Sequence, residues 1–279
     1  MRLILITLGF CLLTNSLKAQ NNQIDVNVMS INVRYNTERD GDHRWDLRKA
    51  SMVKMLLHYH VDLFGVQEAL LEQMNYLDKN LIDFQYIGVG RDNGASKGEF
   101  SGIFFNAAKY NLIQEGTFWL SETPESPSLG WDAAYPRICT YGEFEDKLSG
   151  KRFIVFNTHF DHQGKTARTR SANLIIEKIQ HLNKKDLPVI LTGDFNATPK
   201  EQPITLVTNS LIDGKMVTTS EFYGPTGTFN GFKNDPMDRR LDYIFVKRCQ
   251  VARYIHIDDR TDQNRPISDH LPILATVRF

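Results

Sequence analysis

The segment Val189-Ile190-Leu191-Thr192-Gly193-Asp194-Phe195-Asn196 runs from a short apolar stretch directly into polar residues. Its first three residues are branched and apolar, which is typical of a buried strand. Asp194 and Asn196 are residue types that such a strand does not need. On their own they could form only an Asx-type turn before Pro199, so their meaning depends on how the other strands end.

Other strand-like runs also end in polar residues. Asn32 follows Val26 to Ile31, Gln67-Glu68 follow Leu63 to Val66, and Asn157-Thr158-His159 follow Ile154 to Phe156. Each residue alone has an ordinary explanation, such as a solvated acid for Glu68 or a structural histidine for His159. Strand ends can converge on one rim of a sheet, and loops held there by a rigid scaffold often carry functional residues. The joint pattern therefore favours a site built from several strand ends.

Strand-like and helical patterns alternate along the chain without a break in composition. Helical spacing occurs from Ala50 to Leu57 and from Ala172 to Leu182. The strand-like runs are Ile24 to Val28, Leu63 to Val66, Ile103 to Phe105, Phe153 to Phe156, Val189 to Leu191, Tyr243 to Val246 and Ile273 to Val277. This mixture predicts an α/β protein with helix-covered sheets, organised as one layered domain over residues 20–279 rather than as two separate domains.

Residues 1–19 have the features of a signal peptide. Arg2 precedes the apolar run Leu3 to Leu13, and a polar stretch then ends at Ala19-Gln20. The run is shorter than the roughly 20 apolar residues that span a bilayer. An anchor or a buried N-terminal strand is the alternative. We predict cleavage after Ala19 and an exported protein, periplasmic or extracellular.

The balance of charged residues limits the binding partners that we expect. The chain carries 33 basic and 33 acidic side chains, so its formal net charge is zero. No global positive field attracts polyanions, which argues against tight, sequence-independent binding of duplex nucleic acid but leaves room for a local basic patch. Cys139 and Cys249 could form one disulfide in an oxidising compartment, a question that their spacing leaves open. We expect a monomer without stable membrane insertion.

Several short motifs occur between residues 29 and 272. They are Met29-Ser30-Ile31-Asn32, Val66-Gln67-Glu68, Gly90-Arg91 with Glu99, Asn157-Thr158-His159, Gly193-Asp194-Phe195-Asn196, Arg240-Leu241-Asp242-Tyr243-Ile244-Phe245 and Ser268-Asp269-His270-Leu271-Pro272. In this combination and order the sequence resembles the endonuclease/exonuclease/phosphatase superfamily, also called DNase-I-like. The resemblance implies a four-layered α/β sandwich, in which two mixed β-sheets lie face to face with helices outside. It also implies hydrolysis of a phosphate ester with Mg²⁺ or Mn²⁺.

Glu68 and Asp269 are the candidate ligands of that cation, with Asn32 contributing an amide oxygen directly or through water. Hard divalent cations bind carboxylate oxygens and neutralise negative charge on a phosphoryl group. The sequence contains no Cys/His cluster of the kind that binds zinc. Magnesium or manganese therefore fits better than zinc.

The resemblance also implies the catalytic residues. Asp194 takes the position that orients the attacking water, and Asn196 holds the phosphate or the water. His270 is the phosphate-facing histidine, oriented by Asp242. His159 would be the second such histidine, with Glu99 as its partner.

Three further residues are candidates for substrate binding. Arg91 could fork two phosphate oxygens, with a surface salt bridge as the alternative. Arg137 lies in the aromatic-rich stretch Trp131 to Tyr141, which could line a pocket or only pack. Asp161 could be an additional ligand or orient a histidine, whereas the neighbouring His162 is expected at the surface. The segment 226–232 could cover the site.

Three functions stay open at this point. The first, and the one we predict, is a phosphodiesterase or nuclease-like enzyme that uses metal-assisted attack by water, because the motifs around Asp194 and Asp242 are similar to the exonuclease and deadenylase branch; nucleic acid and a small diester are both candidate substrates. The second is a phosphomonoesterase acting on a sugar, inositol or lipid headgroup phosphate. The third is a non-catalytic binding protein on the same scaffold. Fold resemblance alone does not decide among them.

Overall fold

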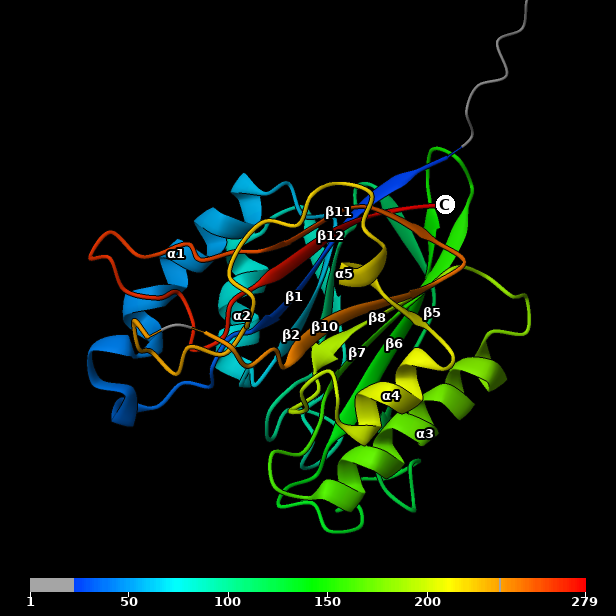
Figure 1. The fold of residues 1–279 in the computed structure, drawn as a ribbon, viewed down its shortest axis with the longest axis horizontal. Helices are drawn as coiled ribbons and strands as arrows, with labels where there is room; N and C mark the ends of the chain where they lie inside the picture. Colours follow the sequence, from blue (N-terminus) through cyan, green and yellow to red (C-terminus); the bar gives the residue numbers. More distant parts are fainter. Residues whose placement is uncertain (1–22, 236) are drawn as a thin grey trace, which may run out of the picture.

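The computed structural model describes residues 23–235 and 237–279 (Figure 1). The predicted signal peptide, residues 1–19, lies outside the described residues. Within them, two six-stranded sheets lie between helices, and helices α1 and α2 are on the opposite side of the sheets from α3 and α4.

The first sheet has the strand order β11-β12-β1-β2-β4-β3. Its strands are β1 (Asp25–Asn32), β2 (Leu63–Gln67), β3 (Phe84–Ile87), β4 (Ile103–Asn106), β11 (Gln250–His256) and β12 (Ile273–Arg278). Strands β1 and β2 are parallel, whereas β12 pairs with β1 in the antiparallel sense. The carboxyl ends of β1 and β2 and the loop that enters β12 therefore meet at one rim.

The second sheet has the order β5-β6-β7-β8-β10-β9. Its strands are β5 (Tyr110–Trp119), β6 (Ile138–Asp146), β7 (Arg152–His159), β8 (Val189–Asp194), β9 (Ile212–Asp213) and β10 (Asp242–Lys247). Strands β7 and β8 are parallel, and β10 runs antiparallel to β8 with Asp242 opposite Asp194. The polar ends of β7 and β8 and the start of β10 thus share a rim as well.

Three apolar clusters separate four layers. One lies between the first sheet and helices α1 (Trp45–His58) and α2 (Leu71–Asn80). A second lies between the sheets. A third lies between the second sheet and helices α3 (Lys165–Leu182) and α4 (Gln202–Thr208). The 3₁₀ helix η1 (Glu38–His43) and the short helix α5 (Gly214–Val217) complete the elements. This arrangement confirms the four-layered α/β sandwich.

A buried polar bridge joins the two sheets close to the shared rim. Asn157 of β7 donates to the carbonyls of Val66 and Gly102 at 2.8 and 2.9 Å, and accepts from Gln67 Nε2 at 2.7 Å. The close contact between Asn157 and the backbone of β2 requires glycine at position 65, because a Cβ at Gly65 would lie 2.3 Å from Asn157 Oδ1. The bridge fixes the two rims relative to each other.

The predicted strands and helices are all present, with one difference in α1. Ala50 and Leu57 are exposed, and the buried face carries Trp45, Met52 and Met55 instead. Cys139 and Cys249 are free thiols; Cys139 packs in the cluster beneath α3. No helix in the part of the chain that the structure describes is long and apolar enough to cross a membrane.

Candidate active site

The strand ends surround a pocket of about 440 Å³. This volume lies within the range of small-molecule sites, roughly 300–1,000 Å³. The residues expected from the sequence that line it are Glu68, Arg91, Glu99, Arg137, His159, Asp194, Asn196, Asp269 and His270. Asn32, Asp161 and Asp242 are buried outside this lining. The structure therefore brings nearly all the expected residues to one place.

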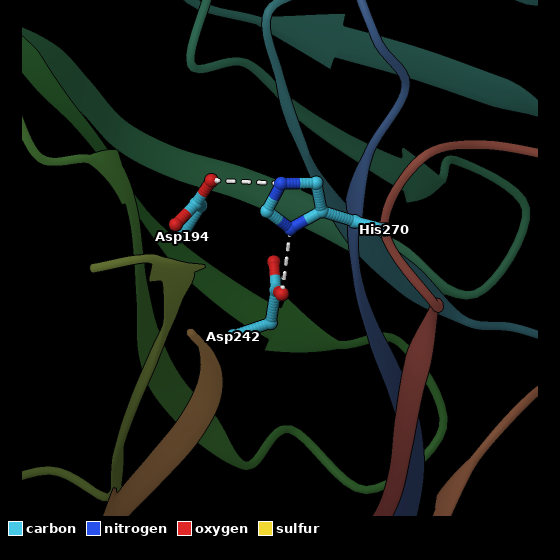
Figure 2. Close-up of side chains that lie close together, drawn as sticks. All are labelled: Asp194, Asp242 and His270. Carbon is cyan, nitrogen blue, oxygen red and sulfur yellow. Dashed lines mark hydrogen bonds and ion pairs between the residues drawn. The ribbon is translucent and has the colours of Figure 1, made fainter. Parts of the chain in front are cut away.

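His270 lies between two carboxylates (Figure 2). Its Nδ1 is 2.8 Å from Asp242 Oδ2, and its Nε2 is 3.7 Å from Asp194 Oδ2. The hydrogen bond between Asp242 and His270 that the resemblance implies is therefore present. It fixes the orientation of the imidazole ring and leaves Nε2 directed at Asp194.

The two carboxylates favour the protonated form of His270. Burial alone lowers the pKa of His270, but attraction to Asp242 and Asp194 outweighs burial and raises this pKa well above its ordinary value. An imidazolium ion can stabilise negative charge on a phosphoryl group. Burial also raises the pKa of Asp194, against the opposing effect of His270. A carboxylate with raised proton affinity suits a group that orients a water molecule and accepts its proton.

Asp194, Asp242 and His270 could also be taken for a metal site, because one ligand atom of each lies within 4.8 Å of the others. The short bond to Asp242 already occupies Nδ1. We therefore interpret the three residues as a hydrogen-bonded relay.

Glu68 and Asp269 form a separate acidic pair in the pocket. Glu68 directly follows β2 with a left-handed backbone, φ 63°, which costs a residue with a Cβ about 1–2 kcal/mol. Such conformations cluster at functional sites. Burial raises the pKa of Asp269, His270 opposes this, and the nearby Glu68 carboxylate adds to it. Two largely buried carboxylates that repel each other fit a hard divalent cation.

Asn32 directs its amide nitrogen at Glu68 of this pair. Its Oδ1 accepts from the backbone N–H of Arg34 at 2.9 Å. Its Nδ2 instead donates to Glu68 Oε1 at 2.9 Å and to Asp194 Oδ2 at 3.1 Å. The backbone N–H can only donate, so it fixes the orientation of the amide. Asn32 thus holds two carboxylates in place, and its contribution to a cation through Oδ1 stays a prediction.

The predicted pair of His159 and Glu99 is not formed. His159 Nδ1 lies 3.8 Å from Glu99 Oε2, and Glu99 accepts two hydrogen bonds from Arg91, at 2.7 and 2.9 Å. The planar fork of arginine matches a carboxylate in this way, so Arg91 forms a salt bridge, the alternative given for it, and Glu99 is bound to Arg91 rather than to His159. Burial and the charges of Arg137 and Arg91 lower the pKa of His159 well below its ordinary value. The pKa values of His159 and His270 are therefore shifted in opposite directions.

Asp161 is a support for Arg137 and not a substrate contact. Its carboxylate accepts from the backbone N–H groups of Ala134, Gln163 and Gly164, and from Arg137 Nε at 3.3 Å. Burial raises the pKa of Asp161, but these bonds and the charge of Arg137 outweigh burial and lower it to about 2. All of its acceptor capacity is thus directed at the protein.

Arg137 lines the pocket together with the rings of Tyr135 and His162. Its Nη2 lies 3.1 Å from His162 Nδ1, and the His162 ring stacks on Tyr135. His162 was expected at the surface; it is partly exposed but also belongs to the pocket lining. Tyr135, from the aromatic-rich stretch, is 52% exposed, whereas Trp119 is buried and donates to the carbonyl of Arg91.

The remaining lining residues are Arg34, Tyr35, Phe229, Arg239 and Leu241. Phe229 comes from the segment expected to cover the site, and its ring packs edge-on against His270 with centroids 5.0 Å apart. Arg34 and Tyr35 lie two and three residues after Asn32, so the strand-end pattern could have indicated them. No pattern in the sequence indicated Arg239 as a residue of the pocket.

Two face-to-face sheets with a carboxylate-histidine relay beside an acidic pair define the scaffold of a metal-dependent phosphoesterase. The chain belongs to the Endonuclease/Exonuclease/phosphatase family, whose sequence model matches residues 29–270. Members of this family are hydrolases that act on phosphate esters and depend on a divalent metal.

Solved structures with the same fold include two from Bacteroides thetaiotaomicron. An endonuclease/exonuclease/phosphatase family protein is 38% identical, with a TM-score of 0.89, and the match covers 92% of this chain and 96% of that one. A mannosyl-6-phosphatase is 39% identical, with a TM-score of 0.88, and the match covers 91% of this chain and all of the other, 100%.

Curated relatives include RNA exonucleases. The probable RNA exonuclease NGL3 of Saccharomyces cerevisiae is 24% identical over 255 residues, which cover 81% of this chain but only 49% of that protein. The similarity therefore concerns about half of the longer exonuclease.

Proposed function

We propose that this protein is an exported phosphomonoesterase that uses Mg²⁺ or Mn²⁺ and removes phosphate from a small, sugar-like molecule. The observation that carries the proposal is the confined pocket of about 440 Å³ with the half-exposed ring of Tyr135 beside it. The exposed part of this ring, which also contacts His162 and Arg91, gives a ring-shaped leaving group an apolar surface to pack on. The 39% identity to a mannosyl-6-phosphatase supports the same substrate class. Export rests on the features of residues 1–19.

In the proposed reaction, each residue has a separate task. Asp194 is held by the backbone N–H of Asn196 through Oδ1 and by Asn32 through Oδ2, so it can orient a water molecule for attack. Protonated His270 faces the charge that develops on the phosphoryl oxygens. A divalent cation between Glu68 and Asp269 would neutralise part of that charge. Arg137 supplies a further fixed positive charge.

A phosphodiesterase is the second candidate, because relatives include the probable RNA exonuclease NGL3. A protein that holds a polynucleotide binds its backbone in a positively charged groove and stacks its bases on aromatic rings. The described pocket carries four arginines but also four carboxylates, which are Glu68, Glu99, Asp194 and Asp269. This balance favours a small phosphate ester over a long strand.

The test is turnover of matched substrates by the mature protein with Mn²⁺ and with EDTA. We expect kcat/KM for hexose 6-phosphates and p-nitrophenyl phosphate to exceed that for bis-p-nitrophenyl phosphate and single-stranded RNA. Tyr135→Ala should raise KM for hexose 6-phosphate more than for glycerol phosphate, whereas Tyr223→Ala, at an exposed tyrosine outside the pocket lining, should change neither. Preference for the diester or RNA would contradict the proposal, as would activity that survives chelation.

A further inference from the structure

Arg34 lies in the pocket beside the acidic pair, and its side chain is held rigidly. Its Nε and Nη2 both donate to the carboxylate of Asp40 at 3.0 Å. The guanidinium also lies over the ring of Tyr35, 4.4 Å from the ring centroid. Two hydrogen bonds in the plane of the guanidinium define both its position and its orientation.

The backbone of Arg34 is held as firmly. Its φ of 56° is left-handed, a conformation that persists only where surrounding contacts enforce it. The backbone N–H donates to Asn32 Oδ1 at 2.9 Å, and the carbonyl accepts from Gln73 Nε2 at 3.0 Å. A strained residue held in this way at a pocket points to a role in the site.

The third nitrogen of the guanidinium is left for a ligand. Among the bonds formed within residues 23–235 and 237–279, those of the Arg34 side chain use Nε and Nη2 only. Nη1 lies 3.8 Å from Glu68 Oε2, and Nε lies 3.9 Å from Asp269 Oδ2. Both distances are too long for hydrogen bonds. Arg34 therefore acts on the acidic pair through its charge and keeps an N–H donor available.

We propose that Arg34 binds a phosphoryl oxygen of the substrate next to the divalent cation, and that its charge weakens binding of that cation until the phosphate arrives. Asp40 is the positioning residue that holds Arg34. The proposal rests on the proposed function for its substrate, a phosphate monoester. Its physical basis is that a fixed positive charge would repel a cation held by Glu68 and Asp269 and would attract the phosphate anion of the substrate.

The first test measures Mn²⁺ binding by calorimetry on the mature protein without substrate. Arg34→Gln should bind Mn²⁺ at least about threefold more tightly, because a neighbouring positive charge is removed. Arg34→Lys, which keeps the charge, should match the wild type. The control is Arg39→Gln, which removes the same charge from an exposed arginine outside the pocket lining and should also leave Mn²⁺ affinity unchanged.

The second test measures binding of inorganic phosphate to the Mn²⁺-saturated proteins. Arg34→Gln should weaken phosphate binding at least about tenfold, since hydrogen bonds between charged groups are strong. Arg34→Lys cannot form both hydrogen bonds to Asp40 and should weaken phosphate binding severalfold. If Arg34→Gln does not fold, the result for Arg34→Lys decides the test. Opposite changes in the two affinities support the proposal; a merely structural arginine would weaken both.

Unchanged phosphate affinity in both Arg34 variants, or weaker Mn²⁺ binding in Arg34→Gln, would overturn the role of Arg34. If the proposed function is wrong but the role of Arg34 is right, the experiments give a different result. In that case the wild type hydrolyses no monoester, while the opposite shifts in Mn²⁺ and phosphate affinity still appear in Arg34→Gln.

Discussion

Replacing Asp242 by asparagine separates a relay role from a metal-binding role for this carboxylate. Asp242 and His270 are 0% and 5% exposed, and their hydrogen bond is 2.8 Å long. Asparagine can place an oxygen at the same point but removes the charge. A hydrogen bond to a charged group contributes roughly 1.5–3 kcal/mol, so we expect kcat/KM to fall about 10- to 150-fold.

The assay is steady-state hydrolysis of p-nitrophenyl phosphate over a range of Mn²⁺ concentrations. If Asp242 acts through His270, the Mn²⁺ concentration for half-maximal rate should stay within about twofold of the wild type. Glu68→Gln is the matched comparison, and it should raise this concentration at least about tenfold, because carboxylates set the affinity for such cations. The double variant Asp242→Asn with His270→Asn should be no slower than His270→Asn alone.

The relay interpretation is refuted if Asp242→Asn shifts the Mn²⁺ dependence as far as Glu68→Gln does. It is also refuted if the effects of Asp242→Asn and His270→Asn simply add. Asp242 would then belong to a metal site formed with Asp194. Thermal unfolding of each variant excludes a general loss of structure.

Two further predictions concern stability. Gly65→Ala should destabilise the fold by about 1–3 kcal/mol or more, because its Cβ would meet Asn157 Oδ1 at 2.3 Å; chemical denaturation measures this, and an unchanged midpoint would contradict it. Burial lowers the pKa of His256 to about 3. As the pH falls, the unfolded chain therefore binds a proton at this histidine before the folded protein does. The free energy of unfolding should be highest above pH 6.5 and should fall towards pH 3 by at most about 1.4 kcal/mol per pH unit. His256→Asn should flatten this slope in denaturation curves between pH 6.5 and 4, and an equally steep slope would exclude His256 as its cause.

The strand-end pattern was sufficient to predict which strands supply the site. Asn32, Glu68, His159 and Asp194 each follow an apolar run, and the parallel pairs β1–β2 and β7–β8 bring those ends together. Hydrophobic periodicity reports both the strand and its end. The pairing of Asp242 with His270 came from the family resemblance, because no local pattern joins residues 28 positions apart.

The errors concern side-chain partners, which depend on geometry that spacing does not encode. Glu99 was assigned to His159, but Arg91 reaches the same carboxylate with both nitrogens of its fork. The hydrogen bonds of Asn32 were not expected either, because the left-handed turn at Arg34 directs a backbone N–H at its oxygen. Both outcomes depend on a loop conformation that a sequence pattern does not fix.

The site divides between the two sheets according to chemistry. The acidic pair, Glu68 and Asp269, adjoins β2 and β12 of the first sheet, whereas Asp194 and Asp242 belong to β8 and β10 of the second. His270 and Asn32 cross from the first sheet to carboxylates of the second. In the proposed reaction, the separation of the sheets would therefore set the distance between the cation and the group that orients the water. A phosphoryl group must contact both, so the buried bridge at Asn157 acts on the geometry of the reaction as well as on the stability of the fold.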